Sequence, residues 1–188
     1  MSEVVFRTVK SSQVILKELM VPSYANFGGK VHGGIILSLM DKIAYTCAAT
    51  HAQGYCVTAS VDSVDFVNPV EVGELLTLYA SINYVGKSSM EVGIKVVSED
   101  FKQGIVKHTN TSYFTMVALD EETRKPTQVA GLQLEDEEEM RRFVMGKLRK
   151  KLRRAHQKEI TDIRQALEQD LSQAMAELEG ENCLLPRG

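Results

Sequence analysis

The chain has 188 residues, of which 44% are hydrophobic and 25% charged, and its formal net charge at pH 7 is −3. This length and composition are typical of one globular domain with an appendage, and they allow a sizeable core. The weakly acidic balance gives no support for a nucleic-acid partner, because phosphates select basic surfaces. No apolar run approaches the roughly 20 residues needed to span a bilayer, so we expect no membrane partner.

The N-terminus and the cysteines bear on the cellular compartment. The first residues lack the basic and then apolar layout of a secretory signal. The three cysteines, Cys47, Cys56 and Cys183, are odd in number and widely spaced, which argues against a disulfide framework and shows no metal-ligand spacing. We therefore expect a cytoplasmic protein without a metal site.

The first third of the sequence predicts a strand, a turn-rich loop and a helix. An apolar run over residues 14–20 predicts the strand, and Pro22 ends it. The loop that follows, up to Gly34, contains several glycines, which permit positive φ and close backbone approach. From Gly33 to about His51 the residues are apolar on most sides, which predicts a buried helix.

The middle of the sequence has the period of strands. Residues alternate from Cys56 to Ser63, and three later segments, 75–85, 90–97 and 106–119, are rich in β-branched and aromatic residues. Three long strands joined by short loops predict an antiparallel meander. One early helix followed by strands predicts an α+β fold, in which a curved antiparallel sheet wraps around a central helix.

The chain changes character near Glu135, so we predict one domain over residues 1–134 and a charged helical tail over residues 135–188. Acidic residues lead the tail and basic residues follow, an order that suits the helix dipole. Apolar residues recur at three- and four-residue intervals from Ile160 to Leu178. Two interpretations stay open: a pair of surface helices divided at Gly146, or an oligomerising coiled coil.

A glycine-rich motif points to a known family. Residues 25–34 read Ala-Asn-Phe-Gly-Gly-Lys-Val-His-Gly-Gly, and Met40-Asp41 follows inside the predicted helix. With further matching segments at 61–69, 72–74, 85–89 and 109–114, the motif resembles the hotdog-fold acyl-CoA thioesterases, above all the cytosolic acyl-CoA hydrolase branch. The resemblance covers about residues 10–132 and excludes the tail. It implies a hotdog fold and hydrolysis of acyl-CoA to a free acid and coenzyme A, without a cofactor.

The two glycines at the start of the predicted helix have a physical role in this chemistry. Thioester hydrolysis needs a base, a positioned water and donors for the developing oxyanion. Gly33 and Gly34 lie where a helix offers free N–H groups and its positive dipole end. The resemblance assigns polarisation of the carbonyl to the Gly34 N–H and makes Gly33 a substrate contact.

Asp41 and Asn26 are the predicted catalytic side chains. Asp41 lies about two turns into an apolar helix, where an unpaired carboxylate is costly and where burial would strengthen it as a general base or nucleophile. The alternative is a structural pairing with Lys42, Lys30 or a backbone donor at a subunit contact, whereas the resemblance implies that Asp41 reaches the site across a dimer interface. Asn26 is either a turn former or, by resemblance, the residue that orients water or thioester. We expect His32 to pack through its ring.

The remaining expectations concern coenzyme A and assembly. Lys87, Ser88 and Ser89 match the segment that contacts the nucleotide in the family, and Ser63 matches a strand beside the pantetheine channel, although such a loop is by default a solvated hairpin. The family forms dimers, commonly three in a hexamer, and an exposed strand edge favours pairing. Two other functions stay open: a non-catalytic acyl-CoA-binding or regulatory module, and a hydratase or dehydratase, although the histidine motifs of those enzymes are absent.

Overall fold

The computed structural model describes residues 5–170 and residue 178. The chain divides into two compact units, Met1–Gly146, here the globular unit, and Lys147–Gly188, here the tail unit. The predicted division into a thioesterase-like domain over residues 1–134 and a tail over residues 135–188 stays a prediction. In the described part of the chain, no helix is long and apolar enough to cross a membrane.

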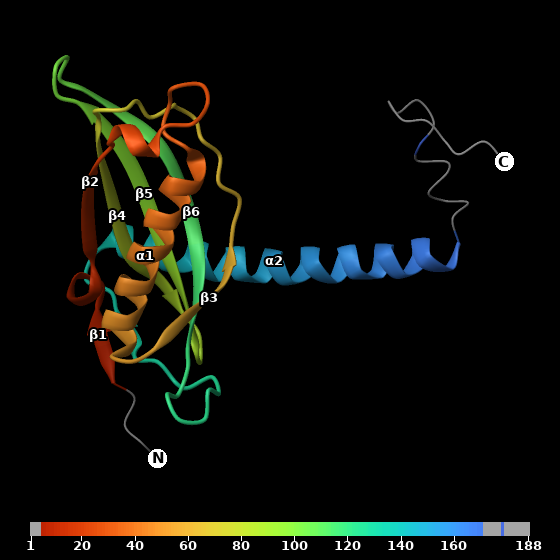
Figure 1. The fold of residues 1–188 in the computed structure, drawn as a ribbon. Helices are drawn as coiled ribbons and strands as arrows, with labels where there is room; N and C mark the ends of the chain where they lie inside the picture. The colour runs from red at the N-terminus through yellow and green to blue at the C-terminus, as the bar shows by residue number, and fades with distance from the viewer. Residues whose placement is uncertain (1–4, 171–177, 179–188) are drawn as a thin grey trace. The chain divides into compact units, whose positions relative to one another are not determined.

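The globular unit is built on a curled five-stranded antiparallel sheet (Figure 1). Its strands are β2 (Val14–Leu19), β3 (Cys56–Val61), β4 (Leu75–Val85), β5 (Ser89–Asp100) and β6 (Ile105–Ala118). They lie in the order β2-β4-β5-β6-β3, so β4, β5 and β6 form the predicted meander. β3 lies at one edge of the sheet, where it pairs with β6 alone among the described strands.

One helix, α1 (Gly33–Ala52), packs on the concave face of the sheet (Figure 1). Alternate residues of the strands point at it and form the core, among them Leu76, Leu78, Ile82, Val92, Ile94 and Met116. The predicted α+β architecture of a sheet wrapped on a helix is confirmed. The expectation that α1 is buried on all sides is wrong for the single chain, because Leu37, Asp41 and Tyr45 are exposed on the face turned from the sheet.

Two short strands were not predicted. β1 (Phe6–Thr8) and β7 (Gly131–Gln133) pair in parallel as a separate sheet, and the 3-10 turns η1 (Val9–Ser12) and η2 (Pro22–Tyr24) flank β2. Three residues are too few to show the two-residue period of a strand. The last turn of the helix, at His51, holds β1, η1 and the residue before β7.

His51 is fully buried at this junction. Its Nε2 lies 3.1 Å from the Ala130 carbonyl oxygen and its Nδ1 lies 3.4 Å from the Ser12 hydroxyl, while Arg7 donates to the His51 carbonyl. Burial lowers the pKa of His51, the contact with Ala130 opposes this effect, and the charge of Arg7 adds to it. His51 is therefore a neutral structural link between α1 and both short elements.

Two of the three cysteines belong to the core. Cys47 and Cys56 are free thiols, both buried. Burial raises the pKa of Cys47 to about 12 and that of Cys56 to about 11. Cys183 lies outside the described residues.

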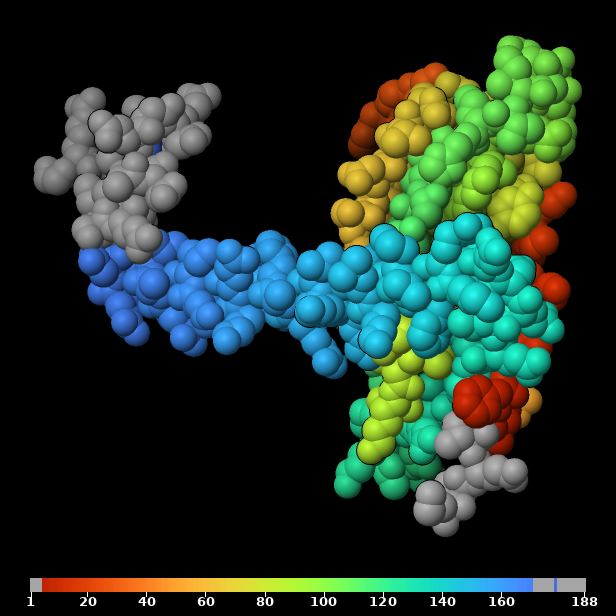
Figure 2. All heavy atoms as spheres, turned by 180° about the vertical axis from the view of Figure 1, so that it is seen from behind, coloured from red at the N-terminus to blue at the C-terminus, as the bar shows by residue number. Residues whose placement is uncertain are grey.

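The last helix, α2 (Glu137–Gln169), begins in the globular unit. Asp136 Oδ1 accepts from the Glu139 N–H at 2.8 Å and Glu139 Oε2 accepts from the Glu135 N–H at 2.7 Å, a reciprocal cap. The first turns cover the outer face of the sheet (Figure 2), where the Phe143 ring lies 5.0 Å from that of Tyr84.

The predicted helix in the tail is confirmed, and it runs through Gly146 without a break. A Cβ on Gly146 would lie 2.7 Å from the Cβ of Tyr84. Glycine at this position therefore allows helix and strand to approach closely, instead of ending the helix as the sequence suggested. Leu171 and Ala174 of the predicted apolar stripe lie outside the described residues.

Candidate active site

The Asn26 loop is a small hairpin closed by its own side chain. Asn26 Oδ1 accepts from the N–H groups of Gly28 at 2.9 Å and Lys30 at 3.1 Å. The backbone N–H of Asn26 donates to the Lys30 carbonyl at 2.6 Å, and Gly29 takes the positive φ of 78° that the turn requires. Asn26 is thus a turn former, and its exposed amide nitrogen remains the group that can meet a ligand.

His32 caps the helix that follows the loop. Its backbone is extended, with φ −66° and ψ 127°, and its Nδ1 accepts from the Gly34 N–H at 2.8 Å. The ring is exposed, so the expectation that it packs is wrong. The donor predicted to polarise a carbonyl is therefore already occupied, and a ligand oxygen must displace the ring to reach it.

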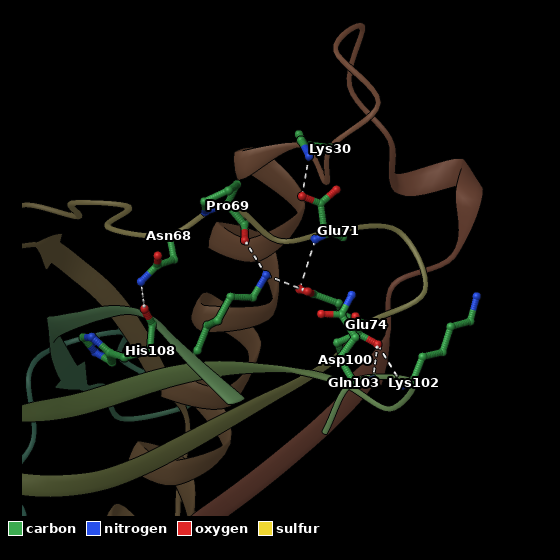
Figure 3. A network of polar contacts seen from close by, with 10 residues as sticks. Lys30, Asn68, Pro69, Glu71, Glu74, Asp100, Lys102, Gln103 and His108 are labelled. Atoms are coloured by element: carbon green, nitrogen blue, oxygen red, sulfur yellow. Dashed lines mark hydrogen bonds and ion pairs between the residues drawn. The ribbon is translucent and has the colours of Figure 1, made fainter. Parts of the chain in front are cut away.

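A strap of residues 62–74, which links β3 to β4, holds the start of the helix. Its Val70 carbonyl accepts from the Val31 N–H at 2.9 Å, and its Glu71 carboxylate forms an ion pair with Lys30 (Figure 3). The Phe66 ring lies 3.5 Å from the position that a Cβ on Gly33 would take. The absence of a side chain at Gly33 therefore leaves the helix end open beside an exposed aromatic ring.

The strap is anchored on β6 by a half-buried ion pair. Lys107 Nζ lies 2.6 Å from Glu74 Oε1, and the Glu74 side chain is only 5% exposed (Figure 3). Lys107 also donates to the Pro69 carbonyl at 3.3 Å, and Asn68 Nδ2 donates to the His108 carbonyl at 2.9 Å. These contacts fix the strap, and through it the start of α1, to the sheet.

Asp41 lies on the exposed face of α1, two turns from Gly34. Its Oδ1 accepts from the hydroxyl of Thr58 on β3 at 2.7 Å. The predicted ion pairs with Lys42 and Lys30 are absent among the described contacts of Asp41, and Lys30 pairs with Glu71 instead. A hydroxyl that donates to one carboxylate oxygen fixes the side chain and leaves the second oxygen to act on a ligand.

Sequence reasoning missed Thr58. A bulge interrupts the pairing of β3 with β6 between Thr58 and Ser60, which changes the direction of the strand next to Asp41. A single threonine in an alternating strand carries no sign of this role. The pairing of residues 17 positions apart follows only from the packing of α1 on the sheet.

The other predicted contacts lie elsewhere. Ser63 is exposed at the start of the strap, and its carbonyl accepts from Ser112 at 3.3 Å. Ser88 and Lys87 accept from the N–H groups of Ala118 and Val129 and form the β4–β5 hairpin. This hairpin lies beside the C-terminal end of α1, with the Gly34 loop at its other end (Figure 1). The single chain therefore does not bring Lys87, Ser88 and Ser89 to Gly33, Gly34 and Asn26.

Gly34 and Asp41 face the same side of the helix but are too far apart to act on one carbonyl group. Seven residues amount to nearly two full turns and about 10 Å along the axis. A base and an oxyanion donor must both lie about 3 Å from their partners on the reacting group. Within the described residues, no group of three His, Cys, Asp or Glu side chains is arranged to hold a metal ion.

The sequence is similar to known thioester hydrolases. The model of the Thioesterase superfamily matches residues 28–105. Protein VdlD of Helicobacter pylori is 47% identical over 146 residues, which cover 78% of this chain and 83% of that protein. The cytosolic acyl coenzyme A thioester hydrolase of Rattus norvegicus is 35% identical over 142 residues, which cover 74% of this chain but only 37% of that longer protein.

Solved structures share the fold. A hexameric acyl-CoA thioesterase without ligand superposes with a TM-score of 0.78 at 36% identity, over 81% of this chain and 97% of that one. The acyl-CoA hydrolase of Staphylococcus aureus, solved with butyryl coenzyme A and coenzyme A, gives a TM-score of 0.77 at 32% identity, over 87% and 99%. It has also been solved with an asparagine, an aspartate or a threonine replaced by alanine. Asn26, Asp41 and Thr58 belong to these three residue types.

Proposed function

Because this chain belongs to the thioesterase superfamily, we propose that it is an acyl-CoA thioesterase, which hydrolyses acyl-CoA to a free carboxylic acid and coenzyme A. The observation that carries the proposal is the helix end, open at Gly33 and capped by His32 at Gly34, combined with a hydroxyl-oriented carboxylate at Asp41. The similarity to named acyl-CoA hydrolases at more than 30% identity supports it.

The groups divide the reaction between them. The Gly34 N–H, once His32 has moved, and the Asn26 amide nitrogen donate to the thioester oxygen. Asp41 takes a proton from the attacking water as general base. The carbon–sulfur bond then breaks, and Asp41 returns the proton to the thiolate of coenzyme A. These steps use side chains and backbone only, so the proposal calls for no cofactor.

The active site needs a second copy of the chain. Antiparallel pairing of two α1 helices about an axis near Leu37 and Ser38 would place the Asp41 of one protomer opposite the Gly34 of the other, because residues 34 and 41 lie symmetrically about that point. Leu37 and Ser38 are exposed, as is the apolar side chain of Val61 on the edge strand β3. The same pairing would carry the Lys87–Ser89 hairpin of one protomer toward the Gly34 end of the other, where the phosphates of coenzyme A could meet it.

We place the assembly at a dimer or a multiple of it, and favour three dimers, as in the hexameric thioesterase of similar fold. We assign the protein to the cytoplasm, on the strength of its similarity to a hydrolase named as cytosolic.

The test is the rate of thiol release from acyl-CoA esters of increasing chain length. Wild type should release thiol from at least one member of the series, and Asp41→Asn should lower kcat by roughly 100- to 10,000-fold, the usual contribution of a general base. Glu121→Gln, which removes an exposed carboxylate from the loop after β6, is the matched control and should leave kcat unchanged.

Three results would go against the proposal. Binding of acyl-CoA without thiol release would favour a regulatory module. Hydration of an enoyl-CoA without thiol release would favour a hydratase. An Asp41→Asn protein with the wild-type rate would exclude Asp41 as the base while leaving the activity itself intact.

A further inference from the structure

The helix of the tail unit carries an apolar stripe. Within residues 147–170 it consists of six side chains: Leu148, Leu152, Ala155, Ile160, Ile163 and Leu167. At 100° per residue they occupy about 140° of the helix surface. Leu152 is 58% exposed and Ile163 is 52% exposed. Polar residues interrupt the same sector, namely Arg149, His156, Glu159 and Asp170. An exposed apolar stripe of this width is nevertheless typical of a helix that packs on another element.

The spacing of the stripe is the same in both directions. The intervals between successive apolar residues are four, three, five, three and four. Two copies of the helix, placed antiparallel about the point between Gln157 and Lys158, therefore meet apolar against apolar at each of these six positions, whereas Ala166 falls opposite Arg149. Leu148 falls opposite Leu167, Leu152 opposite Ile163, and Ala155 opposite Ile160. A twofold interface, in which one patch meets itself, requires this symmetry.

The charges have the complementary arrangement. Residues 147–158 contain seven Lys or Arg and no Asp or Glu, whereas residues 159–170 contain four Asp or Glu and one Arg. Antiparallel pairing sets each basic half on an acidic half, whereas parallel pairing sets basic on basic. Lys151 falls opposite Arg164, which opposes the pairing at one position.

The basic half is also under internal repulsion. The pKa of Lys150 is lowered, first by partial burial and then by the positive charges of Arg154 and Arg153. The repeated like charges of residues 147–158 disfavour any partner that is itself basic.

We propose that residues 147–170 form an antiparallel helix pair with the same residues of a second copy of this chain. The segment lies outside residues 28–105, which the Thioesterase superfamily model matches, and the pairing does not depend on whether the chain hydrolyses acyl-CoA. The partner that we infer is a second copy of this segment, because the apolar spacing reads the same in both directions and a basic half is followed by an acidic half. A helix of another protein would have no reason to match this combination.

Disulfide crosslinking of the full chain tests the pairing and its direction. Cys183→Ser removes the thiol outside the described residues, and Cys47 and Cys56 are buried. On this background Leu148→Cys and Leu167→Cys are made singly and together. An antiparallel pair brings residue 148 of one chain against residue 167 of the other, within disulfide reach. The double variant should form a covalent dimer under mild oxidation, and neither single variant should, because identical positions lie about 28 Å apart.

Added charge supplies the second control. Leu152→Glu in the double variant should abolish the covalent dimer, whereas Thr161→Glu, on the opposite side of the helix, should leave it unchanged. Adding Ile163→Lys to Leu152→Glu should restore it, because opposite charges then meet twice across the antiparallel pair. Crosslinking of either single variant as fast as the double variant would overturn the antiparallel pairing. Failure of the double variant to crosslink, with the far-ultraviolet signal of the helix intact, would overturn the pairing altogether.

Discussion

Asn26 and His32 each use an acceptor atom to hold the backbone at the start of α1. The oxygen of Asn26 holds its own loop, which leaves its amide nitrogen as the group for the substrate. The sequence presented turn forming and substrate contact as alternatives for Asn26. The geometry allows both, because the amide oxygen accepts hydrogen bonds from the loop while the amide nitrogen remains able to donate to a substrate. His32 acts in the other direction, since it covers the donor that the reaction needs.

His32→Phe should therefore raise kcat/KM while it lowers stability. Displacing the hydrogen bond between His32 and Gly34 costs about 0.5–1.5 kcal/mol, so removing the acceptor should raise kcat/KM by roughly 2- to 10-fold. Loss of the cap should lower the free energy of unfolding by about 1 kcal/mol. Steady-state kinetics and thermal unfolding of the same preparation measure the two effects.

His32→Asn is the control for this substitution. It keeps a capping acceptor and should stay near the wild type in both quantities. If both kcat/KM and stability decrease in His32→Phe, the cap serves the fold alone.

Thr58→Val should lower kcat without unfolding the protein. The substitution removes the hydroxyl that donates to Asp41 but keeps the shape of the side chain. A hydrogen bond to a charged group contributes about 1.5–3 kcal/mol, which predicts a decrease of roughly 10- to 100-fold. Thr58→Ser should retain most of the activity, and Thr46→Val, which removes a hydroxyl bonded to its own helix, should leave the rate unchanged. Equal effects of Thr58→Val and Thr46→Val would show that the contact with Asp41 has no part in turnover.

At the scale of elements, long patterns were predictable and short ones were not. The strands from Leu75 to Ala118 and the helix from Gly33 show their period over many residues, so their positions follow from the sequence. β1 and β7 are defined by each other and by the side chain of His51, contacts over more than 40 residues that no local pattern contains. The exposed face of α1 was missed for a similar reason, because exposed apolar residues such as Leu37 and Tyr45 cannot be told from core residues in one sequence.

His51 should make stability depend on pH. Its pKa in the folded state is lowered, so the fold favours the neutral ring. The stabilisation is complete above the unfolded-state pKa of about 6.5 and is lost as the pH falls from there through the lowered folded-state pKa, with a slope of at most about 1.4 kcal/mol per pH unit. Urea unfolding between pH 8 and pH 5 should show this slope, and His51→Gln should reduce it.

Titration of the ring checks the same expectation without a substitution. In the folded wild type, the His51 signal should titrate below about 6.5, the pKa of an unperturbed imidazole, in an NMR experiment. Titration of His51 at or above about 6.5 would contradict the assignment.

At the scale of the whole molecule, two inactive variants should restore activity when combined. If Asp41 serves the site of the partner protomer, a mixed dimer of Asp41→Ala and Asn26→Ala has one site without either defect and one with both. Random mixing then gives about a quarter of the wild-type activity. Half of the dimers are mixed, and one of the two sites in each mixed dimer is intact.

Thiol release after co-expression of the two chains measures this complementation. Co-expressed Asp41→Ala and Asp41→Asn, which share their defect, should remain inactive. A mixture of Asp41→Ala and Asn26→Ala that is no more active than its parents would place the base and the donors in the same protomer.

The burial of Cys47 and Cys56 has a consequence for an enzyme of this activity. Every turnover sets free coenzyme A, whose thiol can form mixed disulfides with accessible protein thiolates as soon as an oxidant is present. With pKa values of about 12 and 11, both described cysteines are almost entirely in the unreactive thiol form at neutral pH, and the core shields them from contact. This part of the chain is thereby immune to derivatisation by its own product, and its activity should persist through oxidative conditions that convert coenzyme A to its disulfide.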